Sequence, residues 1–148
     1  MSSSTSSGWL LDTCLLSELR KQKINPGVAQ WLNGVDLSLA FVSISTIAEL
    51  EMGVAKLHVQ NSILTSNCEK WTVDVKRQFA KTILGSDDEV WRVWAELMGT
   101  GLAQGQPRTA IATLLVATAQ LHHLTIVTRS VRDFAPCPLI HDPWAETA

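Results

Sequence analysis

The sequence has no cysteine arrangement that would support a disulfide framework or a zinc site. Its three cysteines, an odd number with no CxxC spacing, are Cys14, Cys68 and Cys137. The four histidines form no metal-ligand pattern either, because the adjacent His122 and His123 would point about 100° apart on a helix. This usage is typical of a protein from the reducing cytoplasm, which is the location we expect.

The chain also lacks a strong net charge. A formal charge of −2 at pH 7 excludes a nucleic-acid binder that is basic over its whole surface, but it allows a local basic groove around an acidic centre. Basic residues do cluster in three places: Arg20, Lys21 and Lys23; Lys76, Arg77 and Lys81; Arg129 and Arg132. Each cluster is equally compatible with a solvated helix or loop face.

No stretch of the sequence reaches about 18 apolar residues, so we expect no membrane span. The polar residues 1–8 lack a basic n-region, and we predict a flexible leader there and not a signal peptide. A length of 148 residues suffices for one well-buried core. We therefore expect a single domain over residues 9–148, without an internal repeat.

Short apolar runs alternate with segments of helical spacing. GWLLD (8–12), LAFVSIS (39–45) and TIVT (125–128) are typical of buried strands, and CPLIHDP (137–143) contains a short edge strand. The intervening segments predict helices, one of which begins at Pro26 and ends before Gly34. This alternation predicts a parallel sheet covered by helices on both faces.

Three of the expected helical segments have a distinct character. The segment 45–57 has Ser45 or Thr46 as its candidate N-cap. Residues 108–124 are apolar around almost the whole helix circumference, so this helix is expected to pack inside a layer. The middle of the chain, 59–84, is helical and amphipathic. The core residues expected here and in the helix that follows GSDD are Ile63, Leu64, Trp71, Val75, Phe79, Val90, Trp91, Trp94 and Leu97.

Three acidic residues fall where open α/β sheets bind ligands, at the carboxyl ends of the strands. Asp12 ends the first strand, Glu49 lies early in the helix after the second, and Asp133 follows TIVT by a few residues. Two unit charges 4 Å apart repel by about 4 kcal/mol at an effective dielectric near 20, so converging carboxylates call for a cation. Oxygen ligands without Cys or His select Mg²⁺ or Mn²⁺. The spacing alone leaves the metal site open, because any α/β protein has some acids at strand ends.

Three longer blocks carry a more specific pattern: LLDTCLLSEL (10–19), ISTIAELEMGV (44–54) and LLVATAQLHHLTIVTRSVRDF (114–134). In order and spacing they resemble the signature blocks of PIN-domain ribonucleases, in particular the VapC- and FitB-type toxins of bacterial type II toxin–antitoxin pairs. The likeness covers nearly the whole chain. It implies a PIN-like three-layer α/β/α sandwich with a central parallel sheet of four to five strands.

The resemblance assigns roles to residues in each block. Asp12, Glu49 and Asp133 match the family's metal-binding catalytic acids, and Thr13 matches the hydroxyl residue that follows the first acid. A Mg²⁺ or Mn²⁺ ion held by these carboxylates would lower the pKa of a bound water, which then attacks an RNA phosphodiester. Arg129 and Arg132 are candidates for contacting the RNA backbone, as are the basic residues 20–23.

The chain departs from the family pattern at three positions. Cys14 and Ser130 stand where Asn is common; Ser130 keeps a hydroxyl that can orient water or metal, and Cys14 is expected to pack beneath the site. The third departure is larger. The family carries a catalytic Asp seven residues before the last Ala of the ATA block, and in this chain that position is Ala112. The resemblance therefore implies a site that lacks one of its acids.

Ala112 has three interpretations. The register of the resemblance could be wrong, although no other acid lies between Glu96 and Asp133 to take the place of the missing one. The chain could be a naturally inactive PIN module that acts as a binding or scaffold protein. Alternatively, an original Asp was replaced by Ala112 to silence a toxic nuclease, which is the interpretation we prefer because every other element of the site is intact.

The resemblance also implies partners. It predicts an RNA substrate, such as a tRNA or an mRNA, and a cognate VapB-like antitoxin through which the chain would reach DNA only indirectly. A homodimer is expected as well. Other Mg²⁺-dependent phosphotransfer folds fit less well: a haloacid-dehalogenase-like phosphatase needs an Asp at position 14, where this chain has Cys14. A receiver domain needs an acidic pair and a late Lys, and neither is evident.

Overall fold

The computed structural model describes residues 6–134, 137 and 139–146. Residues 1–5 of the predicted leader lie outside this range. Ser7 already contacts the folded chain, because its N–H donates to the carbonyl oxygen of His123 at 2.7 Å. Gly8 is the first residue of the first strand.

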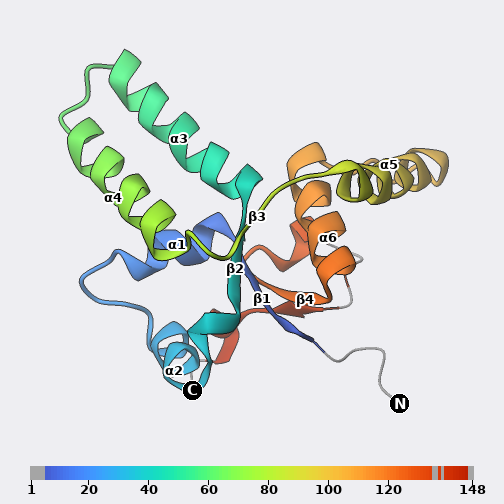
Figure 1. Ribbon diagram of the computed structural model, residues 1–148, viewed down its shortest axis with the longest axis horizontal. Coiled ribbons are helices and arrows are strands. Elements are labelled where there is room, and N and C mark those ends of the chain that lie inside the picture. The colour runs from blue at the N-terminus through green and yellow to red at the C-terminus, as the bar shows by residue number, and fades with distance from the viewer. Residues whose placement is uncertain (1–5, 135–136, 138, 147–148) are drawn as a thin grey trace.

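A five-stranded parallel sheet runs through the middle of the molecule (Figure 1). Its strands lie in the order β3-β2-β1-β4-β5. They are β1 (Gly8–Leu11), β2 (Ala40–Ser43), β3 (Ile83–Leu84), β4 (Leu124–Val127) and β5 (Ile140–His141). β1 is central and pairs with β4 over its whole length, from Gly8 opposite Leu124 to Leu11 opposite Val127. All strand pairs are parallel, as the alternation of strands and helices predicts.

Within the described residues, six α-helices and three 3₁₀ turns surround the sheet. They are α1 (Thr13–Leu19), α2 (Pro26–Gly34), α3 (Ile44–Val59), α4 (Thr65–Gln78), α5 (Asp88–Ala103), α6 (Ala110–His122), η1 (Leu37–Leu39), η2 (Val131–Phe134) and η3 (Pro143–Glu146). In Figure 1, α1 to α4 lie to one side of the sheet and α5 and α6 to the other. The predicted three-layer α/β/α sandwich is confirmed.

Each face of the sheet contributes to its own hydrophobic core, because successive strand residues point to opposite faces. Leu11 and Val127 pack with α1 to α4, whereas Leu10 and Ile126 pack with α6. These four side chains are at most 1% exposed. A smaller cluster around Val90 joins α5 to α6. The two cores fix the carboxyl ends of β1 and β4 side by side, which is where the predicted site lies.

α6 lies buried between the sheet and α5. All seven residues from Thr113 to Ala119 are buried, so the expectation from its apolar circumference is correct. Its last turn ends on His123, which adopts a left-handed conformation with φ of 56°. The indole Nε1 of Trp94 donates to the carbonyl oxygen of Ala110 at 3.0 Å, so α5 also fixes the first turn of α6.

The α3–α4 pair differs from the sequence prediction. The two helices pack against each other and project from the body of the molecule (Figure 1). Val75 and Phe79 lie in the core as predicted. Ile63 and Leu64 do not: they lie in the turn between the helices and are 94% and 58% exposed. At the far end of a projecting pair there is no third layer to cover them.

Three further details correct the prediction. The middle segment is not helical throughout, since Ile83–Leu84 form β3 and pair with β2. α3 is capped by Ser43, whose hydroxyl accepts from the N–H of Ser45, so Ser45 and Thr46 lie inside the helix. Trp91 is 45% exposed and makes an edge-to-face contact with Trp94 at 5.2 Å between ring centroids.

Across the part of the chain that the structure describes, none of the helices is both long and apolar enough to cross a membrane.

Candidate active site

One pocket of about 490 Å³ brings the predicted catalytic positions together. It is lined by Asp12, Thr13, Cys14, Glu49, Thr109, Ile111, Ala112, Leu115, Ser130, Asp133 and Phe134. These residues follow β1, lie on α3, open α6 and follow β4, so the parallel sheet gathers them at the carboxyl ends of its strands. All four predicted catalytic positions and both predicted supporting residues line it.

Asp12 is held at the floor of this site by its neighbours. It directly follows β1 and is the N-cap of α1, where its Oδ1 accepts from the N–H of Thr13 at 2.8 Å. Its Oδ2 accepts from the hydroxyl of Thr128 at 2.8 Å. Oδ2 also accepts from the Cys14 thiol at 3.4 Å. Two carboxylate oxygens offer about four acceptor directions, so Oδ1, which accepts one bond, keeps capacity for a further ligand.

Thr128 is a site residue that the sequence reasoning missed. It follows β4 directly, and it is 0% exposed. Its hydroxyl donates to Asp12 and accepts from the N–H of Ser130 at 3.0 Å, so one buried group ties the end of β1 to the loop after β4. The sequence signal was the position of Thr128 in the TRS stretch, one residue after a buried strand. A threonine at such a position can also be an ordinary strand residue.

Glu49 lies beside Asp12 and is half-buried on α3. Its Oε1 accepts from the Thr13 hydroxyl at 3.1 Å, so Thr13 links the two acidic residues through its backbone N–H and its side chain. Burial raises the pKa of the Glu49 carboxyl above its usual 4.5, and the negative charge of Asp12 raises it further, although the Thr13 hydrogen bond opposes both effects. Glu49 therefore holds a proton more readily than an exposed glutamate does.

Asp133 lies on the opposite wall of the pocket. It belongs to the 3₁₀ turn η2, is exposed, and its backbone N–H donates to the carbonyl oxygen of Ser130 at 3.0 Å. Ser130 is also exposed at the rim. The loop after β4 thus presents a carboxylate and a hydroxyl to the same cavity.

Ala112 is the third residue of α6 and faces the pocket from the first turn of that helix. Its methyl group packs with the core on the α6 side of the sheet. An acid at this position would enter the cavity that Asp12, Glu49 and Asp133 line, which agrees with the register of the resemblance. The methyl group present here can neither accept a hydrogen bond nor bind a cation.

Cys14 lines the cavity next to Asp12. Its thiol lies 3.4 Å from Asp12 Oδ2 and 3.5 Å from the Thr128 hydroxyl, and it accepts from the N–H of Arg129 at 3.4 Å. Burial raises the pKa of the Cys14 thiol, and hydrogen bonds from Arg129 and Thr128 only partly offset this rise. A raised pKa makes the thiol less reactive, but Cys14 lines the cavity and does not pack beneath it as the sequence analysis expects.

The donor chemistry of the pocket fits a hard divalent cation. Carboxylate and hydroxyl oxygens converge on it, and the like charges of Asp12 and Glu49 repel each other in the absence of a cation. The set is nevertheless incomplete. Over residues 6–134, 137 and 139–146, no group of three or more His, Cys, Asp or Glu side chains is close enough to hold a metal ion together. Asp12 and Glu49 form a pair, and Asp133 faces them across a gap that Ala112 borders.

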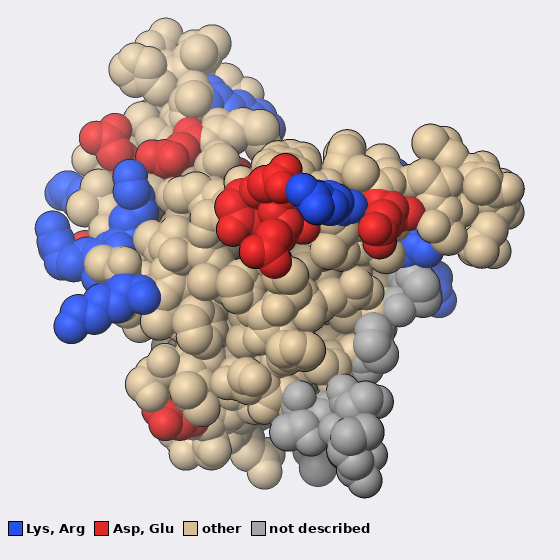
Figure 2. All heavy atoms as spheres, turned by 45° about the vertical axis from the view of Figure 1, so that its right-hand side comes forward, with Lys and Arg blue, Asp and Glu red and all other residues tan. Residues whose placement is uncertain are grey.

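The predicted RNA-contacting arginines lie in different surroundings. Arg132 lines a second cavity, which borders the acidic pocket, whereas the guanidinium of Arg129 lies 5.8 Å from the ring centroid of Trp144. The guanidinium of Arg20 stacks on Trp71 of α4 at 4.4 Å, which places the basic cluster after α1 beside that helix. In Figure 2, many of the visible Lys and Arg side chains lie on the left side of the molecule, and one basic side chain lies between the acidic ones near the middle.

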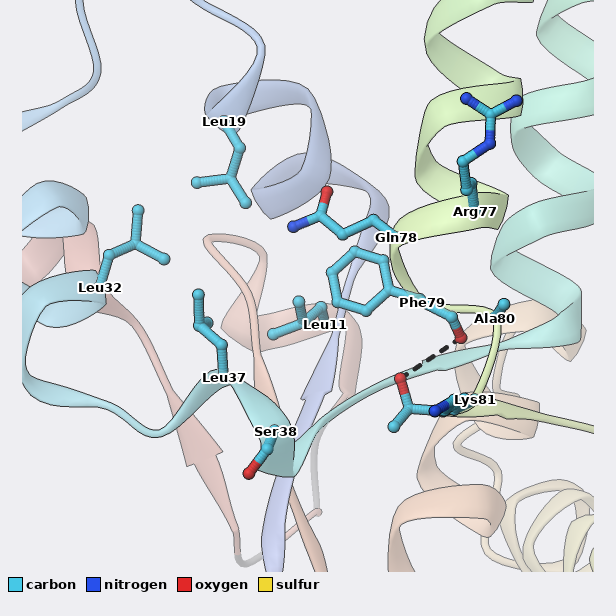
Figure 3. Close-up of a pocket in the computed structure, with 11 residues that line it drawn as sticks. Leu11, Leu19, Leu32, Leu37, Ser38, Arg77, Gln78, Phe79, Ala80 and Lys81 are labelled. Atoms are coloured by element: carbon cyan, nitrogen blue, oxygen red, sulfur yellow. Dashed lines mark hydrogen bonds between the residues drawn. The ribbon is translucent and has the colours of Figure 1, made fainter.

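A further cavity of about 350 Å³ contains none of the predicted site residues. Figure 3 shows it between α1, α2 and the end of α4, with the side chains of Leu11, Leu19, Leu37 and Phe79 around it. Its lining is mostly apolar, and no carboxylate enters it. This cavity shares no lining residue with the pocket that gathers the predicted catalytic positions.

Comparison with known proteins gives relatives over most of the chain, although no family model matches it. The chain is 30% identical over 138 residues to toxin FitB of Neisseria gonorrhoeae, covering 91% of this chain and 97% of that protein. It is 28% identical, also over 138 residues, to VapC ribonuclease Y4jK of Sinorhizobium fredii, covering 91% of this chain and 96% of that one.

Solved structures agree with these relatives. The crystal structure of FitAcB from Neisseria gonorrhoeae superimposes with a TM-score of 0.78 at 29% identity, covering 92% of this chain and 98% of the other. The structure of FitAB bound to an IR36 DNA fragment gives a TM-score of 0.73 at 29% identity, with 92% and 95% of the two chains covered. Sequence and fold therefore point to the same group of proteins.

Proposed function

Because the chain belongs to the PIN-domain family of FitB- and VapC-type toxins, we propose that it has the scaffold of a metal-dependent endoribonuclease toxin. The observation that carries this proposal is the single pocket lined by Asp12, Glu49 and Asp133. Ala112 borders the same pocket. We propose that this chain is inactive or strongly impaired because the carboxylate expected at that position is missing.

The chemistry follows from the residues of the pocket. Asp12, Glu49 and Asp133 would hold Mg²⁺ or Mn²⁺, which when bound lowers the pKa of a water so that it can attack the RNA phosphodiester. Thr128 and Thr13 fix the carboxylates of Asp12 and Glu49, so these groups need no reorganisation on binding the ion. Ser130 presents a hydroxyl at the rim, where it would orient water.

An acid at position 112 has two possible contributions, and Ala112 supplies neither. It would complete the set of carboxylates around the ion, or it would accept a hydrogen bond from the attacking water and so orient it. The intact surroundings favour deliberate replacement of an original Asp. Asp12, Thr13, Glu49, Ser130 and Asp133 all line one cavity, whereas loss of function by drift would erode several of these positions.

The decisive test is the variant Ala112→Asp. We expect it to cleave RNA in the presence of Mg²⁺, to lose activity in EDTA, and to arrest growth when expressed, whereas the unaltered chain does none of these. Ala112→Asn is the matched control, because it has nearly the same shape without the charge, and we expect it to remain inactive. Failure of Ala112→Asp to cleave RNA and to arrest growth would count against the nuclease assignment.

The alternative function is a naturally inactive PIN module that binds RNA or a partner without cutting. The same pocket supports it, since a cavity that lacks one acid can still bind a cation and a phosphate. RNA binding by both the unaltered chain and Ala112→Asp, with no cleavage by either, would favour this alternative.

The partners follow from the same family. We propose a small VapB-like antitoxin, a homodimer, and contact with DNA only through the antitoxin; the FitAB assembly on DNA supports the antitoxin and its DNA contact. Co-expression with the small reading frame expected next to the gene tests the antitoxin, since the two chains should co-purify. Light scattering of the chain alone tests the dimer.

A further inference from the structure

A second cavity, of about 350 Å³, shares a wall with the acidic pocket. It is lined by Gln106, Pro107, Arg108, Thr109, Thr113, Val116, Arg132 and Asp133. Thr109 and Asp133 also line the acidic pocket, so the two cavities are neighbours at the first turn of α6. Its lining includes two arginines, Arg108 and Arg132, and one carboxylate, that of Asp133.

Arg108 is fixed in this cavity by its packing against α5. A Cβ atom added to Gly101 would lie 3.1 Å from both Cγ and Nε of Arg108, so the arginine stem lies directly on the glycine backbone. The side chain is half-buried, and its Nε is shielded from solvent. Arg108 is therefore not a freely moving surface arginine, and less side-chain entropy is lost when its guanidinium binds a ligand.

The loop before α6 is held by the same glycine. The N–H of Gln106 donates to the carbonyl oxygen of Gly101 at 2.8 Å, and a Cβ at Gly101 would lie 2.7 Å from the Gln106 carbonyl oxygen. Only a glycine permits this approach. The contact fixes where the loop enters α6, and with it the relation of Arg108 to the acidic pocket.

The start of α6 adds to the positive potential between the two cavities. Its N-cap, Thr109, makes no side-chain capping bond, so the Thr109 hydroxyl satisfies none of the first backbone N–H groups of the helix. Such a helix end carries about half a positive charge and favours anions. Here the helix end adds to the positive potential of the two arginines.

We propose that this cavity binds a phosphate of the RNA backbone next to the scissile one, with Arg108 as the main contact and Arg132 as the second. This inference rests on the proposed function, and it adds how the RNA strand would be positioned at the acidic pocket. The acidic pocket repels RNA until a cation is present, so a fixed cationic subsite beside it would hold the strand across the acids. Guanidinium groups match phosphate oxygens in a planar, two-bonded geometry, which suits Arg108 to this role.

Binding by the unaltered chain in EDTA tests the subsite without requiring cleavage. The probe is a fluorescein-labelled single-stranded RNA of mixed sequence, followed by anisotropy at several salt concentrations. We expect Arg108→Gln to weaken binding by about 10-fold or more and to reduce the salt slope by roughly 0.7, the value for one phosphate contact on a single strand. We expect Arg108→Lys to bind the RNA more weakly than the unaltered chain and more tightly than Arg108→Gln.

Arg92→Gln is the matched control. Arg92 lies on α5, pairs with Asp88 and is exposed, and it does not line either cavity, so its loss removes the same charge elsewhere. We expect it to change affinity by less than about 2-fold. Equal effects of Arg108→Gln and Arg92→Gln, or no measurable RNA binding by the unaltered chain, would overturn the assignment.

Gly101→Ala tests whether the position of Arg108 matters beyond its charge. The variant keeps every arginine and favours the helix intrinsically, but its methyl group displaces Gln106 and Arg108. We expect a loss of affinity similar to that of Arg108→Gln, with circular dichroism confirming the fold. Affinity equal to that of the unaltered chain would show that net charge alone drives binding and would overturn the proposal.

A neutral linkage identifies the phosphate. A methylphosphonate placed next to the linkage that Ala112→Asp cleaves should weaken binding to the Arg108-containing protein, and it should cost little in the Arg108→Gln background. Equal losses in both backgrounds at every position tested would contradict the subsite. If Ala112→Asp cleaves nothing, the methylphosphonate is moved along the RNA in the EDTA assay, so the nuclease proposal can fail while the subsite stands.

Discussion

Thr128 and Thr13 are the side chains that fix the acids of the pocket at the scale of single residues. Each donates a hydroxyl hydrogen bond to a carboxylate: Thr128 to Asp12 at 2.8 Å and Thr13 to Glu49 at 3.1 Å. Hydrogen bonds to charged groups are worth more than those between neutral groups. The placement of the acids therefore depends on two hydroxyl groups.

Removing the Thr128 hydroxyl should destabilise the fold measurably. Thr128→Val keeps the shape of this fully buried side chain, but it removes the donor to Asp12 and the acceptor for the N–H of Ser130. We expect a loss of about 1.5–3 kcal/mol in the free energy of unfolding, measured by urea denaturation. In the Ala112→Asp background, the same change should also lower the RNA-cleavage rate.

Thr118→Val is the control for that measurement. Thr118 is also 0% exposed, but its hydroxyl donates to the carbonyl oxygen of Leu114 within α6, which the helix can bond without it. We expect a cost below about 1 kcal/mol. Equal losses in the free energy of unfolding for Thr128→Val and Thr118→Val would show that the hydrogen bond to Asp12 contributes no more than the one within α6.

Glu49 should make stability depend on pH. Its carboxyl has a pKa raised above 4.5 in the folded state, by burial first and by Asp12 second. The folded state then binds the proton more tightly than the unfolded state, so this stabilisation is complete below pH 4.5 and is lost as pH rises through the folded pKa. Glu49→Gln should therefore raise the metal-free melting temperature at neutral pH and change it little at pH 4, as thermal melts in EDTA will measure. A constant difference at all pH values would exclude this linkage.

At the scale of elements, β1, β2, β4, β5 and α6 could be predicted because their signals are local. The apolar circumference of α6 requires a buried helix, and Pro26 and Gly34 give the bounds of α2. The tip of the α3–α4 pair could not be predicted in the same way. Apolar periodicity indicates which side of a helix is apolar, but whether another layer covers Ile63 and Leu64 depends on the tertiary fold.

β3 was missed for a related reason. It has only two residues, and it exists because Ile83 and Leu84 pair with the edge of β2. Two residues carry no period that distinguishes a strand from the end of a helix. The cap of α3 was misplaced by two or three positions because Ser43, Ser45 and Thr46 are all good capping residues, and only the backbone geometry selects Ser43.

The α3–α4 pair allows the stability contributions of a buried and an exposed apolar residue to be compared. Phe79 is 6% exposed and packs in the core, whereas Leu64 is 58% exposed in the turn. We expect Phe79→Ala to cost about 3–5 kcal/mol and Leu64→Ser to change stability by less than about 0.5 kcal/mol, both by chemical denaturation. A large cost for Leu64→Ser would indicate that the turn is covered in solution, for example by a second copy of the chain.

At the scale of the whole molecule, the sequence predicts where the site lies. It does not predict how close the acidic side chains of the site come to one another. Parallel strands bring Asp12, Glu49 and Asp133 to one edge, and the sequence alone indicates this. How near the acids come to one another depends on side-chain contacts such as Thr13 to Glu49, and on the turn η2 that carries Asp133. Those contacts between distant segments are not visible in a sequence pattern.

The missing acid should appear in the stability of the whole protein. An Asp at position 112 would gain about 0.3–1 kcal/mol from the start of α6, but repulsion between neighbouring carboxylates reaches about 4 kcal/mol at 4 Å and an effective dielectric of 20. Repulsion is the larger effect, so Ala112→Asp should melt lower than the unaltered chain in EDTA, by roughly 2–4 °C for each kcal/mol. Differential scanning fluorimetry measures this.

Adding Mg²⁺ should reverse the order of the two proteins. A ligand at 100 times its dissociation constant stabilises the folded state by about 2.7 kcal/mol, and the completed set of acids should bind the ion more tightly. NaCl at the same ionic strength is the control. A higher melting temperature for Ala112→Asp already in EDTA would contradict the repulsion on which this prediction rests.

The hydrogen bond between Thr128 and Asp12 joins residues 116 positions apart, and the β1–β4 pairing that carries it is equally long-range. During synthesis, a ribosome has to release almost the entire chain before this contact can form, and such non-local pairing is late and slow. The same holds for the pocket, one wall of which is Asp133. In a nuclease of this design, therefore, an unfinished polypeptide still attached to its messenger cannot cut RNA.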